Sequence, residues 1–194
     1  MTNSLADAIA LLGDAAEANR AAAREIYDAG RRLAEAAVSA WRADAELASL
    51  LGGERPEITV GVAVLSDNFQ RIRAANGSPP LVDVPPEQDA MKFELHFAGG
   101  IVLDVLTSRE PAGEGAIARF LKNRGEGIQQ VEYRVSDVER AAQIVAEKFG
   151  VAPVYPQTRT GAGGTRINFF LARVPGGERV LIEFYETGAA KRPH

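Results

Sequence analysis

The chain has 194 residues, 46% of them apolar and 25% charged, as is ordinary for a soluble globular protein of one or two domains. Its net charge of −4 provides no basic field that would favour nucleic acid or an anionic membrane surface as a partner. Cysteine is absent, which excludes disulfides and thiolate metal sites and fits a cytoplasmic protein. The first residues resemble no signal peptide, and no apolar run is long enough to cross a bilayer, so we expect no membrane partner.

Residues 4–51 are rich in alanine and contain no proline, and their apolar side chains recur at three- and four-residue steps. This period predicts an all-helical segment. Ser4 followed by Asp7 predicts a capping box at its start. Glycines 52–53 before Pro56 predict its end.

One straight helix of this length would span about 70 Å, which is too long for one small domain to cover. We therefore expect the segment to bend near Gly13 or Gly30, or to pack against a second copy of the chain. Two interpretations of residues 1–53 stay open: a helical cap on its own domain, or an element that forms a homodimer. The many small alanines permit the close approach of a coiled coil, although no long heptad of large residues is present.

After Pro56 the sequence changes to short β-type runs, and the same order of elements occurs twice. The first set is a strand at 58–65, a helix at 67–75, a short run at 81–84 and strands at 91–98 and 101–106. A connecting helix at 116–122 leads to the second set: a strand at 128–135, a helix at 138–149, a run at 151–155, and strands at 166–173 and 179–186. Gly99-Gly100 and Pro175-Gly176-Gly177 predict hairpin turns. The repeated βαβββ order predicts an α+β fold with modules at 58–106 and 127–186.

The alternation of side chains along these strands places polar residues on shared faces. Gln130, Glu132 and Arg134 share one face of their strand. Lys92, Glu94 and His96 share one face of theirs. If the two modules form a curled sheet with helices outside, these faces line a concave cavity; the alternative is that they are the solvated faces of open sheets.

Glu183 lies between Ile182 and Phe184 in the last strand. A carboxylate in so apolar a run must be paired, protonated, bound to a metal or exposed to a wet cavity, because burying a bare charge is too unfavourable. The alternative is a glutamate on an edge strand that faces water.

Six short motifs resemble, in order, those of the vicinal-oxygen-chelate superfamily, which includes glyoxalases, bleomycin-resistance proteins and dioxygenases. The resemblance is closest to the methylmalonyl-CoA epimerase family. The motifs are GVAV at 61–64, PEQ at 86–88, IARFL at 117–121, GEGI at 125–128, GAGGTRINF at 161–169 and VLIE at 180–183. The resemblance implies a glyoxalase-like curled sheet over residues 56–190. The helical extension at 1–53 has no counterpart in the family.

The family binds a divalent metal through one residue from each of four strands, usually including two histidines. The resemblance places these positions at Thr59, Asp104, Gln130 and Glu183, so neither histidine is kept. Without imidazole, the set offers only oxygen ligands, which suit a hard ion such as Mg²⁺ or Mn²⁺ held weakly, or no metal at all.

The family's chemistry implies a proton relay in which one carboxylate removes a proton next to a thioester and a second returns it on the opposite face. The two carboxylates correspond to Glu183 and Glu94 here. Gln130, Glu132 and Arg134 are the expected substrate-binding residues of one strand, and His96 and Asn168 those of two others. Several of these side chains could donate hydrogen bonds to an oxyanion in place of a metal.

Three functions remain open. The first is an epimerase-like isomerase, or a related lyase, acting on an acyl or oxo-acid substrate. The second is a metal-free, non-catalytic module of the same superfamily that binds such a small molecule. The third is an assembly protein that works through its helices and keeps a vestigial cavity.

Overall fold

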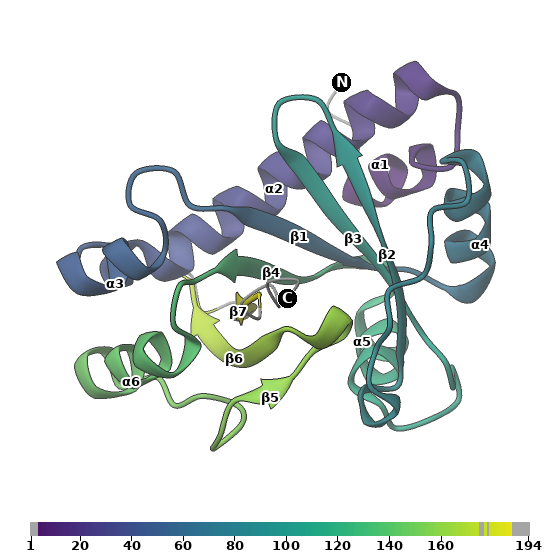
Figure 1. Ribbon diagram of the computed structural model, residues 1–194. Helices are drawn as coiled ribbons and strands as arrows, with labels where there is room; N and C mark the ends of the chain where they lie inside the picture. The colour runs from purple at the N-terminus through teal and green to yellow at the C-terminus, as the bar shows by residue number, and fades with distance from the viewer. Residues whose placement is uncertain (1–3, 175–176, 178, 188–194) are drawn as a thin grey trace, which may run out of the picture. The chain divides into compact units, whose positions relative to one another are not determined.

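The computed structural model describes residues 4–174, 177 and 179–187, and the chain divides into two compact units. The first consists of residues 1–32 and 59–131, and the second of residues 33–58 and 132–194. Each holds one of the two modules expected from the sequence, and the α+β class is confirmed (Figure 1). Among the described residues, no helix is long and apolar enough to span a bilayer.

The first unit packs α1, α2 and α4 against a small sheet. Its elements are α1 (Leu5–Leu11), the first part of α2 (Ala16–Arg42), β1 (Ile58–Ala63), α4 (Ser66–Ala75), the 3₁₀ turn η1 (Pro86–Gln88), β2 (Ala90–Phe97), β3 (Ile101–Ser108), α5 (Ala116–Arg124) and the first part of β4 (Gly127–Arg134). Strand β1 pairs in parallel with β3, and β2 pairs with β3 antiparallel. Gly99 and Gly100 make the β2–β3 turn with φ of 83° and 75°, values that glycine adopts without strain.

The N-terminal helices form part of the core of this unit. The capping box at Ser4 and Asp7 is present, and the helix breaks near Gly13 while Gly30 lies inside α2. Apolar residues of α1 and α2 are buried together with those of β1, α4, β2 and β3. Gly30 allows the close approach of α2 to β1, because an added Cβ would lie 2.6 Å from a methyl carbon of Val60.

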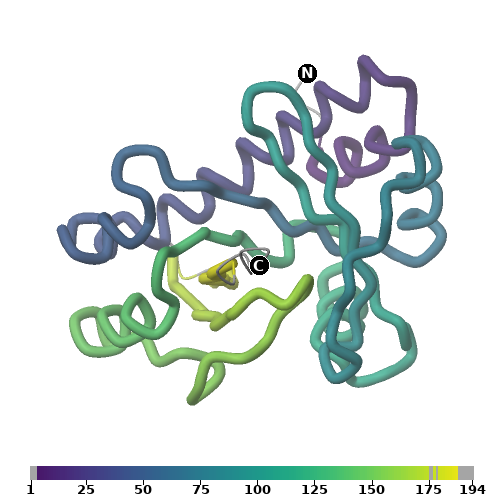
Figure 2. Tube along the Cα trace, in the orientation of Figure 1, coloured from purple at the N-terminus to yellow at the C-terminus, as the bar shows by residue number. Residues whose placement is uncertain are grey.

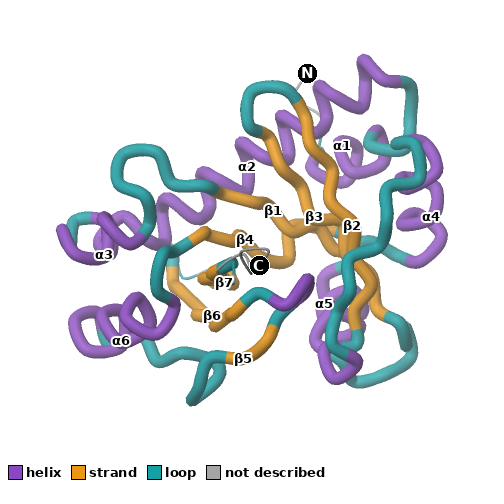
Figure 3. The backbone as a smooth tube through the Cα atoms, viewed as in Figure 1, coloured by secondary structure: helices purple, strands orange, loops and turns teal. Residues whose placement is uncertain are grey.

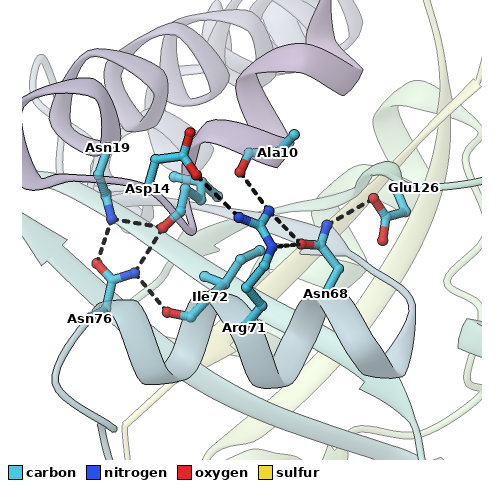
Figure 4. Close-up of polar contacts among 9 residues, drawn as sticks. Ala10, Asp14, Asn19, Asn68, Arg71, Ile72, Asn76 and Glu126 are labelled. Carbon is cyan, nitrogen blue, oxygen red and sulfur yellow. Dashed lines mark hydrogen bonds and ion pairs between the residues drawn. The ribbon is translucent and has the colours of Figure 1, made fainter.

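A polar network fastens the turn between α1 and α2 to α4 (Figure 4). Asn19, which is buried, donates to the carbonyl of Leu12 at 2.7 Å and to Oδ1 of Asn76 at 2.9 Å. Arg71 donates to the carbonyl of Ala10 at 2.6 Å. These bonds satisfy carbonyls at the end of α1 that have no partner within the helix.

The second unit consists of a β-hairpin and the helices that accompany it (Figures 2 and 3). Its elements are the rest of α2, α3 (Ala45–Leu50), the end of β4, α6 (Val138–Phe149), β5 (Arg159–Thr160), the 3₁₀ turn η2 (Ala162–Gly164), β6 (Arg166–Arg173) and β7 (Arg179–Glu186). Strands β6 and β7 pair antiparallel as expected. In the predicted turn between them, Pro175 and Gly176 lie outside the described residues.

Two predicted runs did not become strands. Residues 81–84 make one backbone bond, from Val82 N to Lys92 O at 2.9 Å, and form no ladder. Residues 151–155 contribute a single bridge, Pro153 to Phe170, and the short strand β5 lies farther along the chain. The prolines beside both runs remove backbone donors that a longer ladder would need.

An aromatic cluster forms the core of the second unit. The centre of the Trp41 ring on α2 lies 5.9 Å from the ring centre of Phe170 and 6.2 Å from that of Phe184, both in edge-on contacts. It lies 6.4 Å from the ring centre of Phe149. The second half of α2 is therefore buried within its own chain, as the helical-cap interpretation expects. Homodimer formation through the helices remains a prediction.

We predict that Trp41→Ala lowers the free energy of unfolding by about 3–5 kcal/mol, because it removes a buried indole from three ring contacts. Urea denaturation at several protein concentrations provides the measurement. The matched control is Ser39→Ala, an exposed position on the same helix, which we expect to change stability by less than about 0.5 kcal/mol. A small effect of Trp41→Ala would contradict the role of α2 as a core helix.

Candidate functional site

The register of β2 against β3 sets out a polar face in the first unit. Glu94 is paired with Asp104, so Lys92, Glu94 and His96 lie on the same side of the sheet as Asp104. Phe93 and Leu95 point to the other side and are buried in the core. The predicted alternation of these residues is therefore present in the sheet.

Gly61 makes room on this face for Gln130. Gly61 is paired with Asp104 in the parallel β1–β3 ladder, and a Cβ added there would lie 2.6 Å from Cγ of Gln130. The Gln130 side chain therefore crosses over Gly61, beside Asp104. Thr59 lies two residues before Gly61 and shares its face. The first unit thus brings three predicted metal ligands, Thr59, Asp104 and Gln130, onto one buried surface.

A buried ion pair between Lys92 and Asp104 occupies this surface. The Lys92 Nζ contacts Asp104 Oδ2, and the two side chains are only 12% and 1% exposed. Lys92 lies diagonally across the ladder from Asp104, a spacing that long side chains bridge. Among the described residues, the other carboxylate oxygen of Asp104 has no hydrogen-bond partner. Lys92 was not among the predicted site residues, although a lysine facing the same side as an aspartate on the neighbouring strand was the available signal.

Glu94 and His96 lie at the solvent-exposed end of the same face. Nε2 of His96 and Oε2 of Glu94 are 2.9 Å apart, with side chains 66% and 43% exposed. An exposed carboxylate keeps its hydration and lacks the desolvation that tunes a buried acid or base. Glu94 therefore lies in an environment less suited to proton transfer than the sequence suggested.

In the second unit, Glu183 is buried on β7, opposite Phe169 of β6. The Phe169 ring packs edge-on against Tyr155 at 5.8 Å, and the Arg159 guanidinium lies 4.1 Å from the Tyr155 ring centre. Glu132, another predicted site residue, is also buried. Of the two interpretations of Glu183 that the sequence left open, the structure has the buried carboxylate rather than the glutamate facing water.

Arg134 and Asn168 make hydrogen bonds to other parts of the second unit. Arg134 is half exposed and donates to Glu57 at 3.0 Å, and this hydrogen bond and charge raise the pKa of Arg134. Asn168 is paired with Phe184, so it lies on the opposite face of the hairpin from Glu183. Its amide donates to the carbonyl of Tyr155 at 3.0 Å and accepts from the Tyr155 N–H at 3.2 Å. The Asn168 side chain therefore bonds to the Tyr155 backbone, and its role in substrate binding stays a prediction.

The residues of the first unit do not fit a divalent metal. Asp104 is the only anion among its three predicted ligands, and Lys92 already neutralises it. The remaining donors, a hydroxyl and an amide, are neutral and bind hard cations weakly. A separate acidic group, Asp137, Glu139 and Glu186, contains none of the predicted ligands. Two of its members cap α6: Asp137 accepts from Arg140 N and Glu186 from Val138 N.

Comparison with solved structures gives clear matches, whereas no family model and no curated protein matches the chain. Methylmalonyl-CoA epimerase from Mycobacterium tuberculosis is 29% identical, with a TM-score of 0.54 over 68% of this chain and 87% of that one. A hypothetical protein from Bacillus halodurans is 27% identical, with a TM-score of 0.55 over 70% and 96%. A methylmalonyl-CoA epimerase in complex with methylmalonyl-CoA and an ammonium ion is 25% identical, with a TM-score of 0.51 over 70% and 96%.

We predict that Gly61→Ala lowers the free energy of unfolding by about 1–3 kcal/mol, because the new methyl group displaces Gln130 and overpacks the polar face. Gly127→Ala is the matched control, since the nearest atom to its added Cβ is Phe120 Cζ at 3.8 Å, an ordinary contact. Urea denaturation of both variants measures the difference. Equal stabilities would show that Gln130 does not lie over Gly61.

Proposed function

The chain belongs to the vicinal-oxygen-chelate superfamily, and from this premise we propose that it moves a proton at a carbon next to a carbonyl, as an epimerase-like isomerase or a related lyase. The observation that carries the proposal is the buried Glu183 carboxylate, which is paired with Phe169 across the β6–β7 ladder. A carboxylate in an enzyme site can act as a general base toward a nearby acidic C–H.

The reaction needs two proton-transfer groups at opposite faces of one carbon. In our proposal Glu183 takes the proton from the carbon, leaving an enolate, and a protonated second carboxylate delivers a proton to the other face. Glu94, the second group that the sequence predicts, is exposed and paired with His96 in the first unit, so its part in the reaction stays a prediction. Gln130 and Glu132, both buried, are the proposed contacts to the polar part of the substrate.

The proposed substrate is an acyl compound, most simply a thioester with an acidic C–H. Similar epimerases have been seen with methylmalonyl-CoA and with 2-nitronate-propionyl-CoA. One of them also held an ammonium ion, the same chemical group as the end of the Lys92 side chain. These ligands support an acyl-CoA class of substrate for this chain.

The pairing of Lys92 with Asp104 favours one alternative, a metal-free module that binds the same class of ligand without turning it over. The burial of α1 and α2 against their own chain argues against a protein that acts only through its helices. The cytoplasm and a homodimer remain our expectations for its setting, the first because the chain has no cysteine.

We predict that Glu183→Gln reduces the exchange of solvent deuterium into methylmalonyl-CoA by roughly 10²–10⁴-fold, the usual contribution of a general base. Mass spectrometry of the thioester in D₂O measures the exchange, and circular dichroism checks the fold. Glu114→Gln, at an exposed loop position, is the control and should exchange like the unaltered protein.

Undiminished exchange by Glu183→Gln would reject Glu183 as the base. If the unaltered protein exchanges no deuterium but methylmalonyl-CoA still raises its melting temperature, the binding-module alternative replaces the enzyme.

A further inference from the structure

We propose that the Lys92 ammonium is the cation that pairs with the Asp104 carboxylate on the polar face, in place of a divalent metal. The protein then needs no metal for stability or activity. The proposal goes beyond the proposed function, because it concerns the polar face of the first unit by itself.

Burial requires Asp104 to have a cationic partner. The residue is fully buried at the centre of β3, where an unpaired carboxylate would be strongly destabilising. Lys92 reaches it from the neighbouring strand, and its side chain is itself only 12% exposed. The charge of the aspartate is therefore balanced by the chain's own residue.

The same pair opposes metal binding. A divalent ion on Asp104 would have to displace the ammonium or lie next to it, and like charges at such separations repel strongly away from water. Beyond Asp104, Thr59 and Gln130 offer only neutral oxygens on this surface. Such donors do not compensate for that repulsion, because hard cations are held mainly by carboxylates.

The pair also fixes the lysine. An ammonium is a compact point charge on a flexible stem, and Asp104 holds that stem in one place on the polar face.

The first experiment measures metal binding without turnover. The unaltered protein is dialysed against EDTA, then equilibrated with Mn²⁺, and its metal content and melting temperature are determined. A metal site saturated at 100 times its Kd would raise the melting temperature by roughly 5–10 °C. We expect no stoichiometric Mn²⁺ and no such shift. Binding of one Mn²⁺ per chain that Asp104→Asn abolishes would overturn the proposal.

The second experiment tests the pair itself by a double-mutant cycle. Lys92→Met leaves Asp104 buried without its cation, and we expect the melting temperature to fall by roughly 6–20 °C. Adding Asp104→Asn should restore much of the loss. Lys148→Met is the control, since it removes a lysine that pairs with Asp44 at 2.6 Å but is 45% exposed. A fall no larger for Lys92→Met than for Lys148→Met would overturn the pair.

If Lys92→Met does not fold at all, the melting temperatures of Lys92→Arg and of the double variant test the pair instead. Lys92→Arg keeps the positive charge, and the double variant removes both charges. In the deuterium-exchange assay, the unaltered protein should keep its rate in EDTA. Loss of exchange in EDTA would overturn the claim that activity needs no metal, while the metal measurements would stand independently of any turnover.

Discussion

A buried carboxylate on a central strand needs a cation, and at Asp104 that cation comes from Lys92 on the neighbouring strand. The arrangement of the first unit's polar face follows from this requirement. Gly61 leaves room for Gln130 beside the pair, Thr59 lies along the same strand, and the apolar residues of β2 turn to the opposite side. The cation on this face is therefore the Lys92 side chain, and the register of β2 against β3 fixes its position.

The helices at the N-terminus serve the two units rather than forming a domain of their own. Residues of α1 and of the first half of α2 complete the core of the first unit, and Trp41 near the end of α2 completes that of the second. The alanine stripe and Gly30 fit this use, because small side chains let a helix lie close to a sheet. A stripe of alanines alone does not distinguish packing within a chain from packing between chains.

The sequence predicted the repeated order of elements and the hairpins, because each is encoded by local alternation or by turn residues, whereas it left the burial of Glu183 open. The Lys92–Asp104 pair could not be predicted in the same way, since it depends on the register of β2 against β3 and on which rotamer a long side chain adopts. The hydrogen bonds of Asn168 could not be predicted for a related reason. The run at 151–155 forms no ladder, so the backbone of Tyr155 takes its hydrogen bonds from that side chain.

The most direct measurement of the central claim is a crystal structure grown with Mn²⁺ at neutral pH, with anomalous scattering recorded for the metal. The account predicts Lys92 Nζ within hydrogen-bond distance of Asp104 and no anomalous peak beside that carboxylate. An anomalous peak coordinated by Asp104, with the Lys92 side chain turned to solvent, would contradict it.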